Sequence, residues 1–466
     1  MSSKKDNEID VDSIHLVDYL KEEIPVEDLR DFSSSRRIGS IDFVKGIAII
    51  LIIGAHSAKA WLVPHWQFFY GIGFAFLDIV GPSLFVFLSA LSVVFSIRRK
   101  KGEVKEKIIR NRIFSRATMI IVIAVIFNLI SIEFTVPDYS FPATLWGWNI
   151  LMFIGLSQIF SYYALKLNKI SRAVIGLVII FASDTIRLWL FQEKDANIIV
   201  EILHYIVVSP SPMTPLLPWL SICFLSSIFG EYLYEAMVGG TKKDYKKLFR
   251  TFLYWGIFFI LVGIFLGSYT YLPSLTGDEF ILATNTTIGR LPPNEYPHIL
   301  LWYDMITQKF LPDITYPGMW EFTIRGRAPN MIYNLGAALI LIAVCFYFID
   351  IKQKMNNFIT MINYYGKVSL SLFLLHFVFI TLFLNTLDFA AYAILYFGYL
   401  GFWGFIMYIW NEFYDGVGSP EWLMVQVGRI GQKTGKTVKK EILIIEEEIK
   451  GTVQKIKKDR DEELKE

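Results

Sequence analysis

The chain contains ten separate stretches of roughly twenty apolar residues, and this feature restricts its fold more than any other. Of its 466 residues, 54% are hydrophobic, and most of the excess over a soluble domain lies in uninterrupted runs. In hydrocarbon every backbone polar group must be satisfied within the protein, so runs of this length form helices. The sequence therefore predicts an all-α, polytopic membrane protein. The ten predicted spans lie near 41–62, 68–97, 113–133, 144–165, 172–191, 215–237, 251–272, 329–350, 367–385 and 388–411.

The connections between these spans alternate in charge. Those after the second, fourth, sixth and eighth spans hold roughly twenty Lys and Arg, and the opposite set holds about five. Cationic connections stay in the cytoplasm, so we expect both termini inside and the long loop 273–328 outside. We expect 1–35 to be a disordered polar tail, 36–425 to be the membrane domain with the loop as an outer cap, and 426–466 to be a cytoplasmic charged amphipathic helix.

The sequence disfavours several classes of protein. Cys223 and Cys345 both lie inside apolar runs, which argues against a disulfide framework. There is no zinc-like cluster of Cys and His, so we expect no metal, and no Gly-rich loop that would cradle phosphate. Nucleic-acid binding has no support, because the cationic segments are explained as topology determinants. The lipid bilayer is the expected partner, and assembly into a homo-oligomer stays open.

The first span carries three polar side chains, Asp42, Lys45 and His56. Each costs several kcal/mol in hydrocarbon unless it is paired or faces a cavity. Lys45 and His56 are eleven residues apart, which puts them on one helix face and about 16 Å apart along the axis. This pattern indicates a polar path leading inward from one membrane face. Alternatively, Asp42 and Lys45, one turn apart, pair with each other near the inner surface.

Two further histidines and a carboxylate are candidates for catalysis. His65 lies at the outer end of the first span, and His376 lies mid-span. A neutral imidazole can take a proton from an attacking hydroxyl or amine, or carry an acyl group as a nucleophile. Asp78 precedes Gly81-Pro82 and would orient an imidazole that it approaches. The alternative for each histidine is a hydrogen-bonded packing role.

The fifth predicted span also contains charged residues. Asp184 and Arg187 are three residues apart, so their side chains can neutralise each other on one helix face. We interpret them as a structural ion pair within the membrane.

Short motifs run along the chain in the order found in a known superfamily. The segment from Arg37 through Ile41-Asp42-xx-Lys45-Gly46-Ile47-Ala48-Ile49 to His56 resembles the opening helix of integral-membrane acyltransferases. These comprise the heparan-α-glucosaminide N-acetyltransferase-like family and the related type-three acyltransferases of cell-envelope sugars. Most members have Arg where this chain has Lys45, which keeps the charge but loses the bidentate fork. Five further matches follow: DIVGPSLFVFL from Asp78, WNILMFIGL from Trp148, PLLPWL from Pro215, SLSLFLLH from Ser369 and GSPEWL from Gly418.

The resemblance implies an enzyme that takes an acyl group from cytosolic acetyl-CoA, or another acyl-CoA. It implies transfer to an amine or hydroxyl of an extracytoplasmic sugar or glycan. The residues that it implies for catalysis are His56 and His65, with His56 favoured over His65 as general base or acyl carrier. Asp78 completes the predicted catalytic set as the carboxylate that would orient the imidazole. Coenzyme A phosphates need cationic partners at the inner face. The residues assigned to donor binding are Lys45, Asp42, Arg37 and His376.

Two other functions stay open on the sequence. Intramembrane Asp, Lys and His also occur in proton-coupled transporters, so a transporter of a sugar- or lipid-type solute is one alternative. The two halves of the chain show no hydropathy symmetry, which counts against it. A non-catalytic relative that keeps the fold is the other, and its sequence indication is Lys45 in place of Arg.

Overall fold

The protein is built from long apolar helices, as the sequence predicts. The structure is a computed structural model that describes residues 38–63, 66–67, 70, 73, 82–100, 106–131, 145–208, 216–268, 270–271, 319–323, 326–414 and 416–430. The helices in this part of the chain are α3 (Gly39–Trp61), α5 (Pro82–Lys100), α6 (Glu106–Ser131), α7 (Ile150–Ala164), α8 (Lys169–Glu193), α9 (Ile198–Val207), α10 (Leu216–Gly239), α11 (Lys242–Leu266), α14 (Ala328–Phe346), α15 (Asn357–Lys367), α16 (Ser369–Leu375), α17 (Phe389–Tyr414) and α18 (Pro420–Ile430). The shorter elements are β1 (Thr270–Tyr271), β2 (Met319–Trp320), and the single helical turns η8 (Glu321–Thr323), η9 (Tyr347–Ile351) and η10 (Ile380–Phe383).

Several of these helices are long and apolar enough to cross a membrane. Within the described residues there are six, namely α3, α6, α10, α11, α14 continued by η9, and α17, or seven if α15 and α16 together form one span. The chain is therefore a multi-pass membrane protein. Each of the ten predicted ranges contains helix, but the count of ten spans is not confirmed. One reason is that α7, with 15 residues, is about 22 Å long and shorter than the hydrocarbon core.

The predicted span 367–385 differs from a straight helix. α15 ends at Lys367, and α16 begins at Ser369 after a bend of 69°. The bend is at Val368, whose backbone leaves the helical region with φ −104° and ψ 23°. α16 ends at Leu375, and turns and η10 follow it. Hydropathy does not reveal the bend, because the apolar sequence continues through it.

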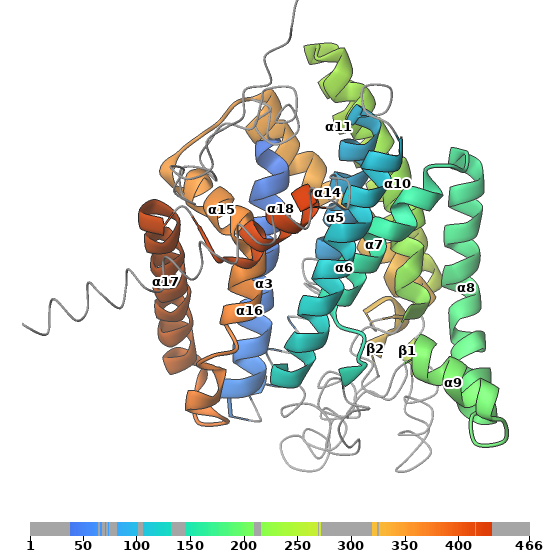
Figure 1. Cartoon of the computed structure of the whole chain (residues 1–466), viewed down its shortest axis with the longest axis horizontal. Coiled ribbons are helices and arrows are strands. Elements are labelled where there is room, and N and C mark those ends of the chain that lie inside the picture. The colour runs from blue at the N-terminus through green and yellow to red at the C-terminus, as the bar shows by residue number, and fades with distance from the viewer. Residues whose placement is uncertain are drawn as a thin grey trace, which may run out of the picture. The chain divides into compact units, whose positions relative to one another are not determined.

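α3 is the helix that joins two groups of neighbours (Figure 1). It packs against α15, α16 and α17 on one side and against α5 and α14 on the other. Its approach to α15 is a contact between backbones. A Cβ added at Gly46 would collide with the carbonyl oxygen of Ile362, and one added at Gly366 would collide with that of Asp42. The glycine of the Lys45-Gly46 motif is therefore explained by close helix packing.

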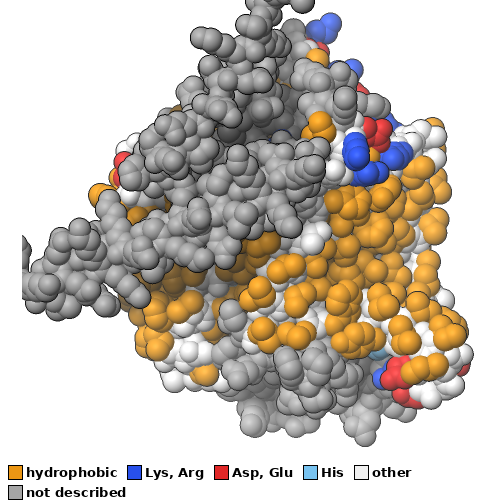
Figure 2. Space-filling model, viewed as in Figure 1, with side chains coloured by type: hydrophobic (Ala, Val, Ile, Leu, Met, Phe, Trp, Pro, Cys, Tyr) orange, Lys and Arg blue, Asp and Glu red, His pale blue; other side chains and the backbone are white. Residues whose placement is uncertain are grey.

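Apolar side chains cover the outward faces of the helices. Figure 2 shows a broad hydrophobic surface, with Lys and Arg gathered along one of its edges. On α8 this surface includes Val174, Val178 and Phe181, each more than half exposed. Such a continuous apolar face is unusual for a protein in water, and it fits helices that face lipid.

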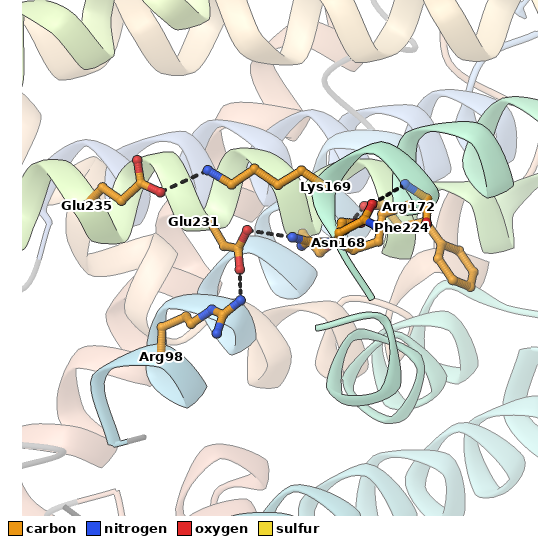
Figure 3. Close-up of polar contacts among 9 residues, drawn as sticks. Arg98, Asn168, Lys169, Arg172, Phe224, Glu231 and Glu235 are labelled. Carbon is orange, nitrogen blue, oxygen red and sulfur yellow. Dashed lines mark hydrogen bonds and ion pairs between the residues drawn. The ribbon is translucent and has the colours of Figure 1, made fainter. Parts of the chain in front are cut away.

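An ion cluster joins α5, α8 and α10 (Figure 3). The carboxylate of Glu231 on α10 accepts hydrogen bonds from Arg98 of α5 and Arg172 of α8. Arg172 also donates from Nη1 to the hydroxyl of Ser227, at 2.9 Å. Glu231 and Arg172 are buried. These arginines come from the cationic connections predicted to set topology, and here they cross-link three helices.

A second ion cluster contains the predicted Asp184–Arg187 pair, which the structure confirms. Asp184 also accepts from Nη1 of Arg327 at 3.2 Å, and Nε of Arg327 lies 2.9 Å from Oε1 of Glu321. The cluster therefore fastens α8 to the start of α14.

Nearby in the sequence, β1 pairs antiparallel with β2, which joins the two ends of the long loop. Residues 273–318 of the loop, the tail 1–35 and the part of the predicted helix 426–466 that follows residue 430 lie outside the described residues.

Candidate active site

Two histidines from distant helices meet inside the membrane domain. Nδ1 of His56, on α3, lies 2.8 Å from Nε2 of His376, the residue at the end of α16. The rings are nearly parallel, with centroids 5.1 Å apart and an interplanar angle of 13°. His376 is fully buried and His56 is half-buried. We call this pair the histidine dyad.

A backbone carbonyl determines which nitrogens of the dyad carry protons. Nδ1 of His376 lies 3.1 Å from the carbonyl oxygen of Leu372. A carbonyl only accepts, so Nδ1 of His376 donates, and in the neutral ring Nε2 is the acceptor. Nδ1 of His56 must then donate to it. In the neutral dyad the lone pair of His56 is therefore on its own Nε2.

Aromatic side chains surround the dyad. The ring of Phe377 lies 4.2 Å from His376 and 5.1 Å from His56, centroid to centroid. Phe373 meets His56 edge-on at 6.3 Å. Phe127 of α6 packs against both phenylalanines, at 5.3 and 5.0 Å. Such surroundings exclude water and strengthen any hydrogen bond made within them.

Hydrogen bonds from α17 hold the helix that carries His56. Tyr392 donates to the carbonyl of Gly54 at 2.8 Å, and Tyr396 donates to that of Ile50 at 2.7 Å. Both tyrosines and both acceptors are four residues apart, so the contacts run along one face of each helix. The indole of Trp61 donates to the carbonyl of Ile380 at 2.7 Å, which ties the end of α3 to η10. The dyad thus lies in a rigid part of the domain.

Comparison with known families places this geometry in context. Residues 37–260 match the sequence model of the family described as heparan-alpha-glucosaminide N-acetyltransferase, catalytic. Over these residues the chain is similar to that family. No match was found among curated proteins. The acetyltransferase family match contains α3 and therefore His56, whereas His376 lies beyond it.

The helix α3 also carries the donor-binding candidates Asp42 and Lys45. Both lie half-buried in the first two turns of α3, on the same continuous helix as His56. The N-terminus of α3 is capped from another segment, because Asp350 accepts from the backbone N–H groups of Gly39 and Ser40, each at 3.1 Å. This carboxylate satisfies two of the helix's unpaired donors and is stabilised by the helix dipole.

The remaining predicted site residues fall into two groups. Arg37, His65 and Asp78 lie outside the described residues. His376 was assigned to donor binding, and in the structure its Nε2 lies 2.8 Å from Nδ1 of His56. The tyrosines of α17 were not predicted, because nothing in an apolar helix sequence shows which neighbour its hydroxyl groups reach. Within the described part of the chain, no cluster of three His, Cys, Asp or Glu could hold a metal ion.

Proposed function

We propose that the protein is a membrane acyltransferase with His56 as its general base. It takes an acetyl group from cytosolic acetyl-CoA and transfers it to an amine or hydroxyl of an extracytoplasmic sugar. The observation that supports this most is the 2.8 Å contact between Nδ1 of His56 and Nε2 of His376. A base held in one tautomer by a second group is the arrangement that activates a weak nucleophile.

The proposed reaction is a direct transfer of the acyl group from the thioester to the acceptor. The acceptor's oxygen or nitrogen attacks the thioester carbon, and Nε2 of His56 takes the proton that the acceptor loses. The new C–O or C–N bond forms, the C–S bond breaks, and the coenzyme A thiolate leaves with that proton. The positive charge on His56 is stabilised in the interval by its Nδ1–H donating to His376. General acid–base catalysis of this kind contributes about 10²–10⁴-fold in rate.

Lys45 is the residue that we propose for the donor's phosphates. It lies eleven residues before His56, a rise of about 16 Å along α3. The pantetheine arm of coenzyme A is of similar length, so phosphates near Lys45 would leave the thioester near the depth of His56. Lys45 has the positive charge of the Arg found in most members of the family, but it lacks the planar guanidinium that binds a phosphate with two hydrogen bonds. It therefore acts on the phosphates as a point charge. We also retain His65 as the second candidate base.

Thiol release from acetyl-CoA tests this proposal. Purified protein in detergent is assayed with and without a pool of amino sugars, beside His56→Ala and His65→Ala. We expect the wild-type protein to release thiol only when an acceptor is present, and His56→Ala to release none. Release of one equivalent without an acceptor would indicate an acyl-histidine in place of direct transfer.

Two other outcomes would contradict the assignment. Loss in His65→Ala with full activity in His56→Ala would move the base to His65. No release from folded wild-type protein with any short-chain acyl-CoA would overturn the enzymatic function. Solute flux into liposomes without acyl-CoA would then support a transporter, and its absence a non-catalytic relative.

A further inference from the structure

The short helix that carries His376 has no cap of its own. α16 has seven residues, and its N-cap residue, Val368, makes no side-chain capping bond. The preceding helix, α15, is bent away by 69°, so its carbonyl groups are not aligned to accept from the first N–H groups of α16. The first N–H groups of such a helix need acceptors from elsewhere, especially where they are buried.

Glu421 supplies that acceptor from a segment fifty residues later in the chain. Its Oε1 accepts from the backbone N–H of Ser371 at 2.9 Å, and its Oε2 accepts from the hydroxyl of the same residue. Ser371 is 1% exposed, so its hydrogen bonds with Glu421 are shielded from water. A carboxyl at the first turn of a helix is further stabilised by the helix dipole.

The segment that carries Glu421 is itself held in place. The backbone N–H of Trp422 donates to the hydroxyl of Ser419 at 3.2 Å, which starts α18. The indole of Trp410 on α17 donates to the carbonyl of Val417 at 2.8 Å. Glu421 is therefore a fixed point against which α16 can be aligned.

The other end of α16 is His376. Its backbone N–H donates to the carbonyl of Leu372 at 3.1 Å, and its own carbonyl accepts from the hydroxyl of Tyr399. Ser371 and His376 are five residues apart, about 7.5 Å along a helix. A rigid helix this short transmits a displacement of its first turn directly to its last residue.

We infer that Glu421 is a positioning residue, whose carboxyl anchors α16 so that Nε2 of His376 meets Nδ1 of His56. The catalytic part of this inference rests on the proposed function of the dyad. It gives the GSPEW motif a physical role that the sequence did not show. Removing the anchor loosens the dyad without touching either histidine, and a displacement of about 1 Å can cost as much as 10²-fold in rate.

The test uses the full chain in lipid nanodiscs with ¹⁵N-labelled histidine. The imidazole signals of His56 and His376 are assigned with His→Gln variants and followed in Glu421→Ala, Glu421→Gln and Glu421→Asp. We expect Glu421→Ala to lose the single-tautomer pattern of the dyad and to lower kcat by about ten- to a hundredfold, with KM for acetyl-CoA unchanged. Glu421→Gln keeps a carbonyl acceptor and should recover part of both.

Asp388→Ala is the matched control, because it removes a helix-capping carboxylate elsewhere in the domain. Asp388 caps α17 by accepting from the N–H of Ala391 at 2.8 Å, and it is exposed. We expect this variant to lower Tm without changing the histidine spectrum. A wild-type spectrum and kcat in folded Glu421→Ala would overturn the inference. If the alanine variant does not fold, the same result in Glu421→Asp would overturn it, because a side chain one methylene shorter should not reach both donors of Ser371. If wild-type protein shows no activity, the proposed function fails, while the spectrum still tests the anchor.

Discussion

Nδ1 of His56 lies 2.8 Å from Nε2 of His376, although 320 positions separate the two residues in the chain. Each ring has a different task in this contact. His376 is fully buried and is held by the carbonyl of Leu372, so in the proposed function it orients its partner. His56 is half-buried and keeps its lone pair on Nε2, which is the nitrogen that can take a proton.

The dyad predicts unequal and non-additive losses of activity. We expect His56→Ala to lower kcat by about 10²–10⁴-fold, because the base is removed. His376→Leu should cost less, because the base remains but its tautomer is no longer imposed. The double variant should be no slower than His56→Ala, since residues that act as a unit are not additive. Thiol release kinetics measure this, and a double variant slower by the product of both effects would separate the two residues.

Lys45 predicts a change in donor affinity. We expect Lys45→Ala to raise KM for acetyl-CoA at least several-fold with little change in kcat, because a phosphate contact binds ground state and transition state alike. Lys45→Arg should keep the affinity. Equal KM values in all three proteins would remove Lys45 from the donor site.

The crossing of α3 and α15 predicts that Gly46 and Gly366 cannot be enlarged. A methyl group at either would meet a backbone carbonyl of the other helix, which cannot move aside as a side chain can. We expect Gly46→Ala and Gly366→Ala each to lower the free energy of unfolding by about 1–3 kcal/mol. Gly398→Ala and Gly401→Ala on α17 are the controls, because nothing lies within 4 Å of either added Cβ. Thermal unfolding in detergent compares the four, and equal Tm values would contradict the close approach.

The ion cluster of α5, α8 and α10 predicts a large effect at Glu231 and a small one at Glu235. Glu231→Gln leaves the buried Arg172 and the neighbouring Arg98 without their shared counter-charge, which costs about 3–5 kcal/mol. Glu235 pairs with Lys169 at 2.8 Å, but these side chains are 58% and 36% exposed. Glu235→Gln should therefore cost at most about 1 kcal/mol. Similar Tm values for the two variants would mean that the buried cluster adds no stability.

Glu421 predicts a pH dependence of stability. Burial raises the pKa of its carboxyl above the ordinary value of 4.5, and the two hydrogen bonds from Ser371 act in the opposite direction. A carboxyl with a raised pKa binds more protons in the folded protein than in the unfolded one. Its contribution is present below the ordinary pKa and is lost as pH rises through the folded value.

Glu421→Gln removes this titration. We expect the Tm of the wild type, measured relative to that of Glu421→Gln, to fall as pH rises from about 4 to 7. The charged neighbours of Glu421 matter little to the comparison, because both proteins retain them. A Tm difference that grows in favour of the wild type with rising pH would show that the pKa is lowered instead.

Parts of the candidate site stood out in the sequence. His56 and Lys45 stood out because polar groups in an apolar run need a reason, and their spacing alone placed them on one helix face. Asp184 and Arg187 paired as expected, because residues three apart on a helix are neighbours by its geometry. His376 was harder to interpret, since the side chains three and four positions before it, Phe373 and Leu372, are apolar.

The sequence by itself determined that this chain lies in a membrane as a set of helices. It also showed which polar residues lie within apolar spans and therefore need a polar partner or a cavity. The reason is that hydrophobicity and helical periodicity are local properties, and hydrocarbon permits few alternatives to a helix. Only the tertiary structure decided that α15 and α16 bend apart at Val368, that Glu421 caps α16, and that His376 meets His56. These depend on contacts between segments far apart in the chain, where packing of one particular backbone against another selects the partner.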